Sequence, residues 1–313
     1  MKLLNEILGT KYPIIQGGMA NIATGEFAAA CSNAGALGLI GAGGMNADTL
    51  RQNIRRCKEL TDKPFGVNIM LMHPQADEFA KIVVEEGVQV VTTGAGNPGK
   101  YMEAWKAAGI RVFPVVASVA LAKRMERAGA DGVIAEGCES GGHIGSITTM
   151  CLVPQVVDAV SIPVLAAGGI ADGRGLAAAL MFGAQGVQMG TVFLASEECR
   201  IHPVYKDLVL SAKDTDTAVT GEICGGAPCR QIKTRYTRRV NERERAGATF
   251  AEIEELTVGS LRRAVQDGDK ENGSFMCGEI AGLVKELRPC AKILEDIFTQ
   301  GEAVMKDRLS LIK

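Results

Sequence analysis

The chain has 313 residues, of which 47% are hydrophobic and 22% charged, and its 34 basic and 36 acidic residues leave a formal net charge of −2. This balance gives no electrostatic footprint for nucleic acid or an anionic membrane, and no run of 18 apolar residues is present to span a membrane. The opening MKLLNEILGTKYP carries charges where a signal peptide is apolar. With nine scattered cysteines, we expect a cytoplasmic protein with reduced thiols.

A repeated pattern runs through the first 190 residues. A helix-like segment ends in a small residue and a glycine, which is typical of a left-handed helix cap. A short burst rich in Val and Ile follows, which is typical of a strand buried on both faces. Eight strands are predicted, near residues 13–16, 37–40, 65–70, 88–92, 111–116, 132–135, 163–167 and 185–189.

Amphipathic segments between these strands, such as ADTLRQNIRRCKEL, predict the intervening helices. Strands that alternate with helices indicate a parallel sheet, and eight units favour an α/β fold closed into a (β/α)8 TIM barrel. An open doubly wound sheet is the competing architecture, and it usually carries an early glycine fingerprint for a nucleotide. GAGGMN at 41–46 matches that fingerprint over too short a stretch to support it.

After residue 200 the alternation stops. Residues 206–274 carry most of the remaining charge, and the segments around TRYTRRVNERERAG predict helices. We therefore expect residues 206–274 to form a small helical lid or substrate subdomain. Residues 1–205, together with 275–313, are expected to form the barrel.

The arginine run in this lid has two interpretations. Such a run is typical of a solvated helix face. Alternatively, it forms a patch for a phosphate-bearing substrate or an acidic carrier protein, in which Arg235, Arg238 and Arg239 act as docking residues through charge steering.

The C-terminal ends of the strands are where barrels of this class place their active sites. Here those ends are mostly small, polar or glycine, which leaves room for a flat ligand and exposes peptide N–H groups. The loops after the seventh and eighth strands often bind phosphate. There Gly168, Gly169 and Gly190 free backbone amides and Thr191 adds a hydroxyl, so we expect an anion site, with ordinary turns as the alternative.

A ligand anchored there would lie across the mouth towards the first strand. Asn68 could hydrogen-bond a ring edge, and Gly17, Gly18 and Met19 could form one wall, since methionine suits an aromatic contact. Flavin mononucleotide (FMN) has this shape, with one phosphate and a three-ring head. A phosphosugar is smaller and usually requires more charged contacts.

His143, within AEGCESGGHIG, is one of only three histidines. An imidazole gives or takes a proton near neutral pH, so His143 is the candidate catalytic residue, with a structural histidine as the alternative. His73 and His202 each precede a proline and are expected to be structural. Cys224 and Cys229 have zinc-ligand spacing, but no second pair follows, so we expect no metal.

Five motifs carry a family resemblance: QGGMA near the start, NIM, GGHIG, AAGGI and QMGT. In this order they resemble the nitronate monooxygenase and 2-nitropropane dioxygenase-like flavoproteins, which are FMN-dependent (β/α)8 barrels. The opening KLLNEILGTKYPIIQGGMA and the later GAPCRQIKTRYTRR and CGEIAGLVKEL are most similar to the bacterial enoyl-acyl-carrier-protein reductase branch of that family.

The resemblance implies that His143 is the catalytic residue and that NADH or NADPH is a co-substrate. It also implies an enoyl thioester on acyl carrier protein or CoA as the substrate, and a homodimer. Many nitronate-oxidising relatives carry glutamine where this chain has Glu136. The cofactor-binding residues that the resemblance implies for FMN are Gly17, Gly18, Met19, Ala20, Asn68, Glu136, Gly141, Gly142, Gly168, Gly169, Gln188, Met189, Gly190 and Thr191.

Two reactions remain open at this point. A reductase of fatty acid synthesis would take its electrons from NAD(P)H, whereas a nitronate monooxygenase would take them from the nitronate and pass them to oxygen. Both share the fold and FMN; the opening and tail segments favour the reductase. A third hypothesis, a phospholigand-binding barrel without catalysis, has no use for His143.

Overall fold

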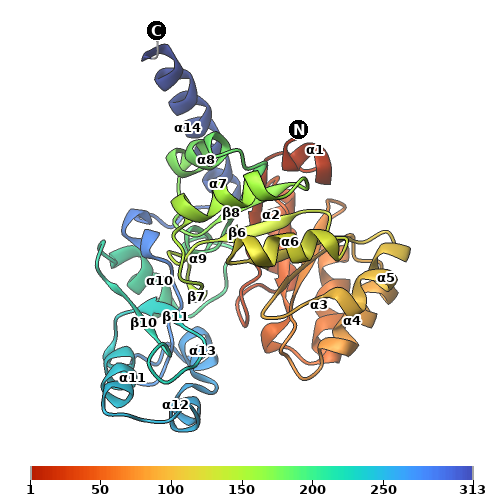
Figure 1. Ribbon diagram of the computed structural model, residues 1–313. Coiled ribbons are helices and arrows are strands. Elements are labelled where there is room, and N and C mark those ends of the chain that lie inside the picture. The colour runs from red at the N-terminus through yellow and green to blue at the C-terminus, as the bar shows by residue number, and fades with distance from the viewer. Residues whose placement is uncertain (1, 312–313) are drawn as a thin grey trace.

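The computed structural model describes residues 2–311 and contains a ring of eight parallel strands (Figure 1). A parallel bridge between Ile15 and Leu37 joins the first strand to the second and closes the ring. The predicted (β/α)8 barrel is confirmed, and every predicted strand overlaps an observed one. The strands are β1 (Ile14–Gln16), β2 (Gly38–Gly41), β3 (Phe65–Met70), β4 (Val90–Gly94), β5 (Arg111–Val116), β6 (Val133–Glu136), β8 (Val164–Ala167) and β9 (Gly186–Met189).

Helices surround the barrel, and several begin where a polar side chain caps them. Thr24, Asn46, Ser118 and Asp172 each accept a hydrogen bond from a backbone N–H of the first turn, as is typical of helix starts. The helices of the ring are α2 (Gly25–Asn33), α3 (Ala47–Leu60), α4 (Ala76–Glu85), α5 (Gly99–Ala107), α6 (Val119–Arg127), α7 (Thr149–Ala159), α8 (Gly173–Met181) and the C-terminal α14 (Cys290–Leu311), with the short turn η1 (Ala42–Gly44) after β2.

The inside of the barrel is a packed core. A layer of large apolar side chains fills it, and α1 (Leu4–Leu8) closes the end at which the strands begin. The opposite end, where the strands finish, is therefore the end left for a site. The interior layer includes Ile15, Leu39, Val90, Phe113, Ile134 and Leu165.

The segment expected to be a helical lid contains helices and also two strands that the sequence did not predict. β10 (Thr217–Thr220) and β11 (Cys229–Ile232) pair antiparallel, and β11 pairs in turn with β7 (Gly142–His143). A small separate core forms there around Tyr236, Val240 and Ile253. The remaining elements are α9 (Thr191–Leu194), α10 (Pro203–Ser211), α11 (Arg235–Arg245), α12 (Phe250–Thr257), α13 (Ser260–Arg262), η2 (Arg263–Asp267) and η3 (Glu279–Leu283).

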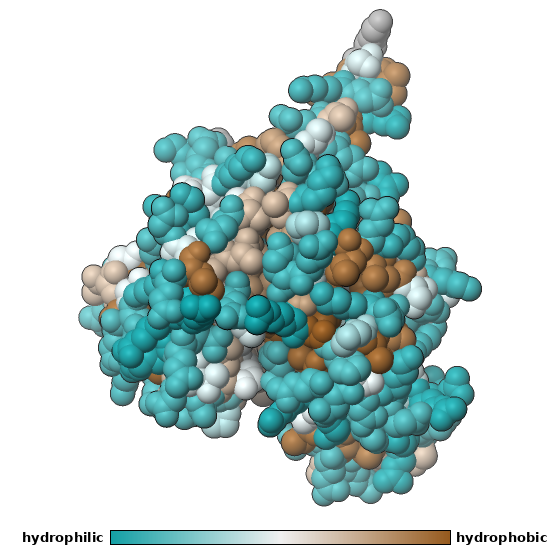
Figure 2. All heavy atoms as spheres, turned by 180° about the vertical axis from the view of Figure 1, so that it is seen from behind, coloured by the Kyte–Doolittle hydropathy of each residue, from teal (hydrophilic) through white to brown (hydrophobic). Residues whose placement is uncertain are grey.

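The last helix, α14, packs along α8 and then projects from the body (Figure 1). Gln300 accepts a hydrogen bond from the Gly173 N–H at the start of α8. On the face seen in Figure 2, hydrophobic residues gather mainly in the middle, within a largely hydrophilic surface. Within residues 2–311, no helix combines the length and the apolar character that crossing a membrane requires.

Candidate functional site

The floor of the site is a layer of polar side chains above the interior core. Side chains alternate along a strand, so residues two positions beyond the core layer also face the barrel interior. Thr92, Glu136 and Ala167 are such residues. Asn68 pairs in register with Thr92, and Gln188 pairs in register with Ala167. The barrel thus brings three of the predicted cofactor residues, on β3, β6 and β9, into one layer.

The end of β1 closes tightly on β3. A Cβ on Gly18 would lie 2.2 Å from the Cβ of Asn68, so only glycine fits there. The Nδ2 of Asn68 donates a hydrogen bond to the Oγ1 of Thr92 at 2.9 Å. This bond fixes the amide and leaves its carbonyl oxygen to accept from a ligand.

The loop after β1 also lies against the end of β9. A Cβ on Gly17 would be 3.5 Å from the Gln188 side chain, and a Cβ on Gly190 would be 3.6 Å from the Met19 sulfur. Ala20 follows in the same loop and approaches the glycines after β2. Among residues 2–311, no hydrogen-bond partner reaches the buried Oε1 of Gln188, and a ligand that donates there would satisfy it.

Met189 differs from the other predicted cofactor residues on β9. Its side chain is buried in the core between the barrel and the helices, because it stands one position away from the inward-facing Gln188. Only its backbone reaches the mouth, where its carbonyl accepts from the Gly17 N–H at 2.8 Å.

The turns after β8 and β9 present free peptide N–H groups. Gly168 and Gly169 adopt left-handed φ values of +91° and +70°, which favour glycine. In the part of the chain that the structure describes, the N–H groups of Gly168, Gly169 and Gly190 donate to no protein acceptor. Thr191 accepts from the Gly278 N–H at 3.0 Å, and its own hydroxyl proton stays available. This donor set fits the phosphate of a nucleotide cofactor.

Glu136 stands at the end of β6 with its carboxyl group buried. Its Oε1 accepts a hydrogen bond from the Ser140 hydroxyl at 2.9 Å, which favours the ionised form. Burial has the larger effect and raises the pKa of Glu136 to about 7. Glu136 therefore exchanges a proton near neutral pH inside the barrel mouth.

The loop between β6 and β7 is braced from both sides. The Glu139 carboxylate accepts from the N–H and the hydroxyl of Thr149, both at 2.9 Å, at the start of α7. On the other side, Arg230 donates to the Cys138 carbonyl at 3.0 Å and forms an ion pair with Glu279 at 2.8 Å. These contacts hold the loop that carries the histidine.

Gly141 and Gly142 allow the segment before η3 to approach this loop. A Cβ on Gly141 would meet the backbone of Cys277 at 2.6 to 2.8 Å. Gly142 has a φ of +82°, and a Cβ there would lie 3.6 Å from the Met276 sulfur. The close contact at Gly141 and the left-handed φ at Gly142 therefore explain why both positions are glycine, apart from any role toward a cofactor.

His143 lies on β7, opposite Cys229 in the register with β11. The residue is exposed to solvent, yet the atoms packed around the ring desolvate it and lower the pKa of His143 below its usual 6.5. At neutral pH the ring is therefore uncharged. A neutral imidazole has one N–H to donate and one nitrogen to accept.

The other two histidines have local structural contacts. The Nδ1 of His73 accepts from the Gln75 N–H at 3.1 Å, and its ring stacks on Phe79. The Nδ1 of His202 accepts from the Val204 N–H and caps α10. Among residues 2–311, no three His, Cys, Asp or Glu side chains form a group that could hold a metal ion.

Some residues of the site escaped the sequence analysis. Thr92 could have been found by following the alternation along the fourth strand. Glu139, Thr149 and Arg230 gave no local signal, because their partners lie 10 or 92 positions away along the chain. Ser140 lies within the motif around His143, but its bond to Glu136 depends on how the loop turns.

Comparison with known proteins adds the family context. The family model described as nitronate monooxygenase matches residues 1–300. A probable nitronate monooxygenase of Staphylococcus saprophyticus is 36% identical, over 97% of this chain and 99% of that protein. A Mycobacterium tuberculosis protein named as a dehydrogenase of a hydroxy-methyl-oxo-octahydroindene-carboxyl-CoA is 33% identical, over 99% and 98% of the two chains.

A solved structure is similar to this chain over almost the whole length of both. FabK from Thermotoga maritima superposes with a TM-score of 0.96 at 50% sequence identity. The match covers 99% of each chain, so the elements of the lid are included as well as the barrel.

Proposed function

The chain belongs to the nitronate monooxygenase family, and we propose that it is an FMN-dependent enoyl-acyl-carrier-protein reductase that uses NADH or NADPH. The observation that carries the proposal is the 50% identity to FabK over both whole chains. FabK belongs to the reductase branch that the opening and tail segments resemble. The relative named for a CoA thioester also favours a thioester substrate.

FMN, when bound, supplies hydride exchange between the nicotinamide and the double bond of the enoyl thioester. The free N–H groups of Gly168, Gly169 and Gly190 would hold its phosphate. Asn68 and Gln188 would hold the edge of its ring system, since Gln188 has an unpartnered buried oxygen. Glu136 would lie beside them and could donate a hydrogen bond when it is protonated.

His143 would act on the thioester. Its neutral ring, which follows from the lowered pKa, would donate an N–H hydrogen bond to the thioester oxygen as negative charge develops there. Stabilisation of that oxygen requires no prior protonation of the imidazole. The brace formed by Glu139 and Arg230 would keep the ring in place during this step.

A second candidate is nitronate oxidation. The name of the matching family model and that of the Staphylococcus saprophyticus relative favour it. In that reaction His143 would hold the anionic nitronate, for which a neutral ring is a weaker partner than a charged one. The two reactions differ in whether NAD(P)H is consumed.

The test is an anaerobic titration of the purified flavoprotein. NADH or NADPH should bleach the flavin absorbance rapidly, and crotonyl-CoA or crotonyl-acyl-carrier-protein should restore it. If neither nucleotide bleaches the flavin but propionate 3-nitronate does, the protein is a nitronate oxidase and the reductase proposal is wrong.

A further inference from the structure

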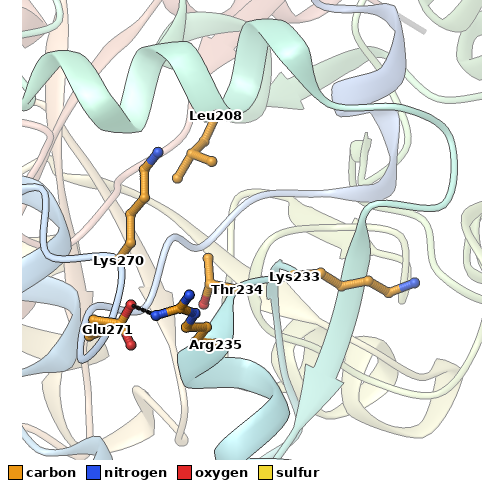
Figure 3. A pocket seen from close by; sticks show the side chains of 6 residues that line it. All are labelled: Leu208, Lys233, Thr234, Arg235, Lys270 and Glu271. Carbon is orange, nitrogen blue, oxygen red and sulfur yellow. Dashed lines mark hydrogen bonds and ion pairs between the residues drawn. The ribbon is translucent and has the colours of Figure 1, made fainter.

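An open groove lies along α11 in the lid, away from the barrel mouth. Two adjoining hollows of about 330 and 400 Å³ share Lys233, Thr234 and Arg235 in their linings. Figure 3 shows the first hollow, which Leu208 and Lys270 line from other segments, while the Lys233 side chain extends away from the other labelled residues. The second hollow continues along the helix and adds Ala218, Thr237, Arg238, Asn241 and Arg245.

The groove is strongly basic although the chain as a whole is weakly acidic. Its linings hold five basic side chains and a single acidic one, Glu271. The Glu271 carboxylate pairs with Arg235 at 2.9 Å (Figure 3). Lys233, Arg238 and Arg245 are exposed, and within residues 2–311 none of the three forms an ion pair. The Nζ of Lys233 donates to the Thr215 carbonyl at 2.5 Å. Among the described residues, Arg238 and Arg245 have no side-chain hydrogen bond, so their positive charge is left for an external anion.

Two basic and two neutral polar residues of the groove lie along one face of the helix. Thr234, Arg238, Asn241 and Arg245 are spaced by four, three and four positions, which places them on one side of α11. This stripe is about 16 Å long at the usual rise of an α-helix. It is much longer than a single phosphate group and matches an extended acidic surface, such as a helix of another protein.

Arg239, one position further round the helix, is used differently. Its guanidinium donates to the Glu271 carbonyl and to the Asn272 side chain, at 3.1 and 3.0 Å. Of the docking residues predicted from the sequence, Arg239 therefore binds within the lid, and Arg235 is paired with Glu271. Arg238 keeps a free charge, as does Arg245, whereas Lys233 donates to a backbone carbonyl.

The groove is connected to the catalytic histidine through one short sheet. Lys233 follows directly after β11, and Cys229 at the start of that strand lies opposite His143. Four residues of strand span about 13 Å. A carrier protein holds its acyl group on a long phosphopantetheine arm, so its docking surface has to lie at such a distance from the reacting carbon.

We propose that the groove around Arg238 and Arg245 docks an acidic face of the carrier protein that presents the enoyl thioester. This inference rests on the proposed reductase function and assigns its macromolecular partner to specific residues. Exposed charges of this kind raise the rate of encounter and make it sensitive to salt. They act on the carrier and not on the thioester group.

The test compares two substrates with the same acyl group on the flavin-loaded enzyme. One is crotonyl-acyl-carrier-protein, and the other is the uncharged crotonyl-N-acetylcysteamine. In the double variant Arg238→Glu with Arg245→Glu, kcat/KM for the carrier substrate should fall by at least about tenfold, whereas that for the small thioester should stay unchanged. Arg243→Glu is the matched control, because Arg243 is exposed on the same helix outside the groove.

Binding of fluorescently labelled acyl carrier protein, followed by anisotropy, gives a readout independent of turnover. It should weaken in the double variant and with rising salt, and remain normal in Arg243→Glu. Unchanged carrier binding, an equal loss with Arg243→Glu, or an equal loss on both substrates would overturn the docking site. Displacement of the carrier by millimolar inorganic phosphate would instead indicate a small-anion site. If neither thioester reoxidises the flavin, the reductase function itself fails, and the binding assay still decides whether the groove docks the carrier.

Discussion

The barrel mouth and the groove on α11 are built for anionic ligands in different ways. The mouth uses peptide N–H groups of glycines, and its positions are defined by the absence of side chains. The groove uses exposed cationic side chains on and beside α11, a helix that begins with a capping box. Ligand binding at the mouth should therefore be sensitive to any added side-chain atom. Ligand binding in the groove should be sensitive to charge reversal and to salt concentration. His143 lies on β7, which pairs with β11, the strand that leads to the groove. It is neither a glycine peptide group nor an exposed cation.

The largest effect on turnover is expected from a substitution of His143. His143→Ala should keep its FMN but lose about 100- to 10,000-fold in kcat, since it would remove the group proposed to stabilise the developing charge on the thioester oxygen. Stopped-flow reoxidation of the reduced flavin by crotonyl-CoA measures this step directly. His73→Asn is the control, because asparagine can still accept from the Gln75 N–H. Near-normal reoxidation in flavin-loaded His143→Ala would show that the histidine is structural.

Glu136 gives the mouth a dependence on pH. Because its folded-state pKa of about 7 lies above the ordinary 4.5, the folded protein binds more protons than the unfolded chain between these values. The free energy of unfolding should therefore fall as pH rises through this window and stay low above it. Glu136→Gln should be more stable than the parent by up to about 3 kcal/mol at pH 8, with little difference at pH 5.

Urea unfolding of both proteins at the two pH values measures this difference. Ser140→Ala provides a comparison, because it removes the hydrogen bond that favours the ionised form. A gain in Glu136→Gln that is equal at pH 5 and pH 8 would mean that the carboxyl does not titrate between them.

The substitution Gly18→Ala tests whether the mouth of the barrel has room for one added side-chain atom. Gly18→Ala places a Cβ 2.2 Å from that of Asn68, and overpacking of this kind costs about 1–3 kcal/mol. The variant should retain less flavin after gel filtration than the parent. Gly99→Ala, at the exposed start of α5 where a Cβ would lie 3.3 Å from the exposed Asn97 side chain, should retain normal flavin. Equal flavin content in the two variants would contradict the close approach of β1 and β3.

The smallest expected effects distinguish Arg238 from Arg239, which are neighbours on α11. Arg239→Ala removes the hydrogen bonds to Glu271 and Asn272 and should lower the free energy of unfolding by about 1 kcal/mol, with little change in carrier binding. Arg238→Ala should weaken carrier binding and leave the stability unchanged. Thermal unfolding and anisotropy on the same two proteins check both, and a reversed pattern would contradict the assignment of the two side chains.

Much of the barrel could be predicted from local patterns. Glycine after a helix and a buried Val- and Ile-rich burst both reflect backbone preferences of a few adjacent residues, so all eight strands were located. The same reasoning pointed to the glycine turns at Gly168 and Gly190. It did not find β7, β10 and β11, because strands of two to four residues at the edge of a lid carry too few alternations to be recognised.

The sequence by itself therefore determined the architecture, the glycine-lined mouth and the candidate histidine, His143, in the segment after β6. Only the tertiary structure decided which side chains work together. Met189 faces the outer core and Gln188 the mouth because of the strand's register. Arg239 is paired and Arg238 is free because Glu271 and Asn272, more than 30 positions away, fold against one side of α11. Such contacts depend on distant segments meeting in space, and no local pattern records them.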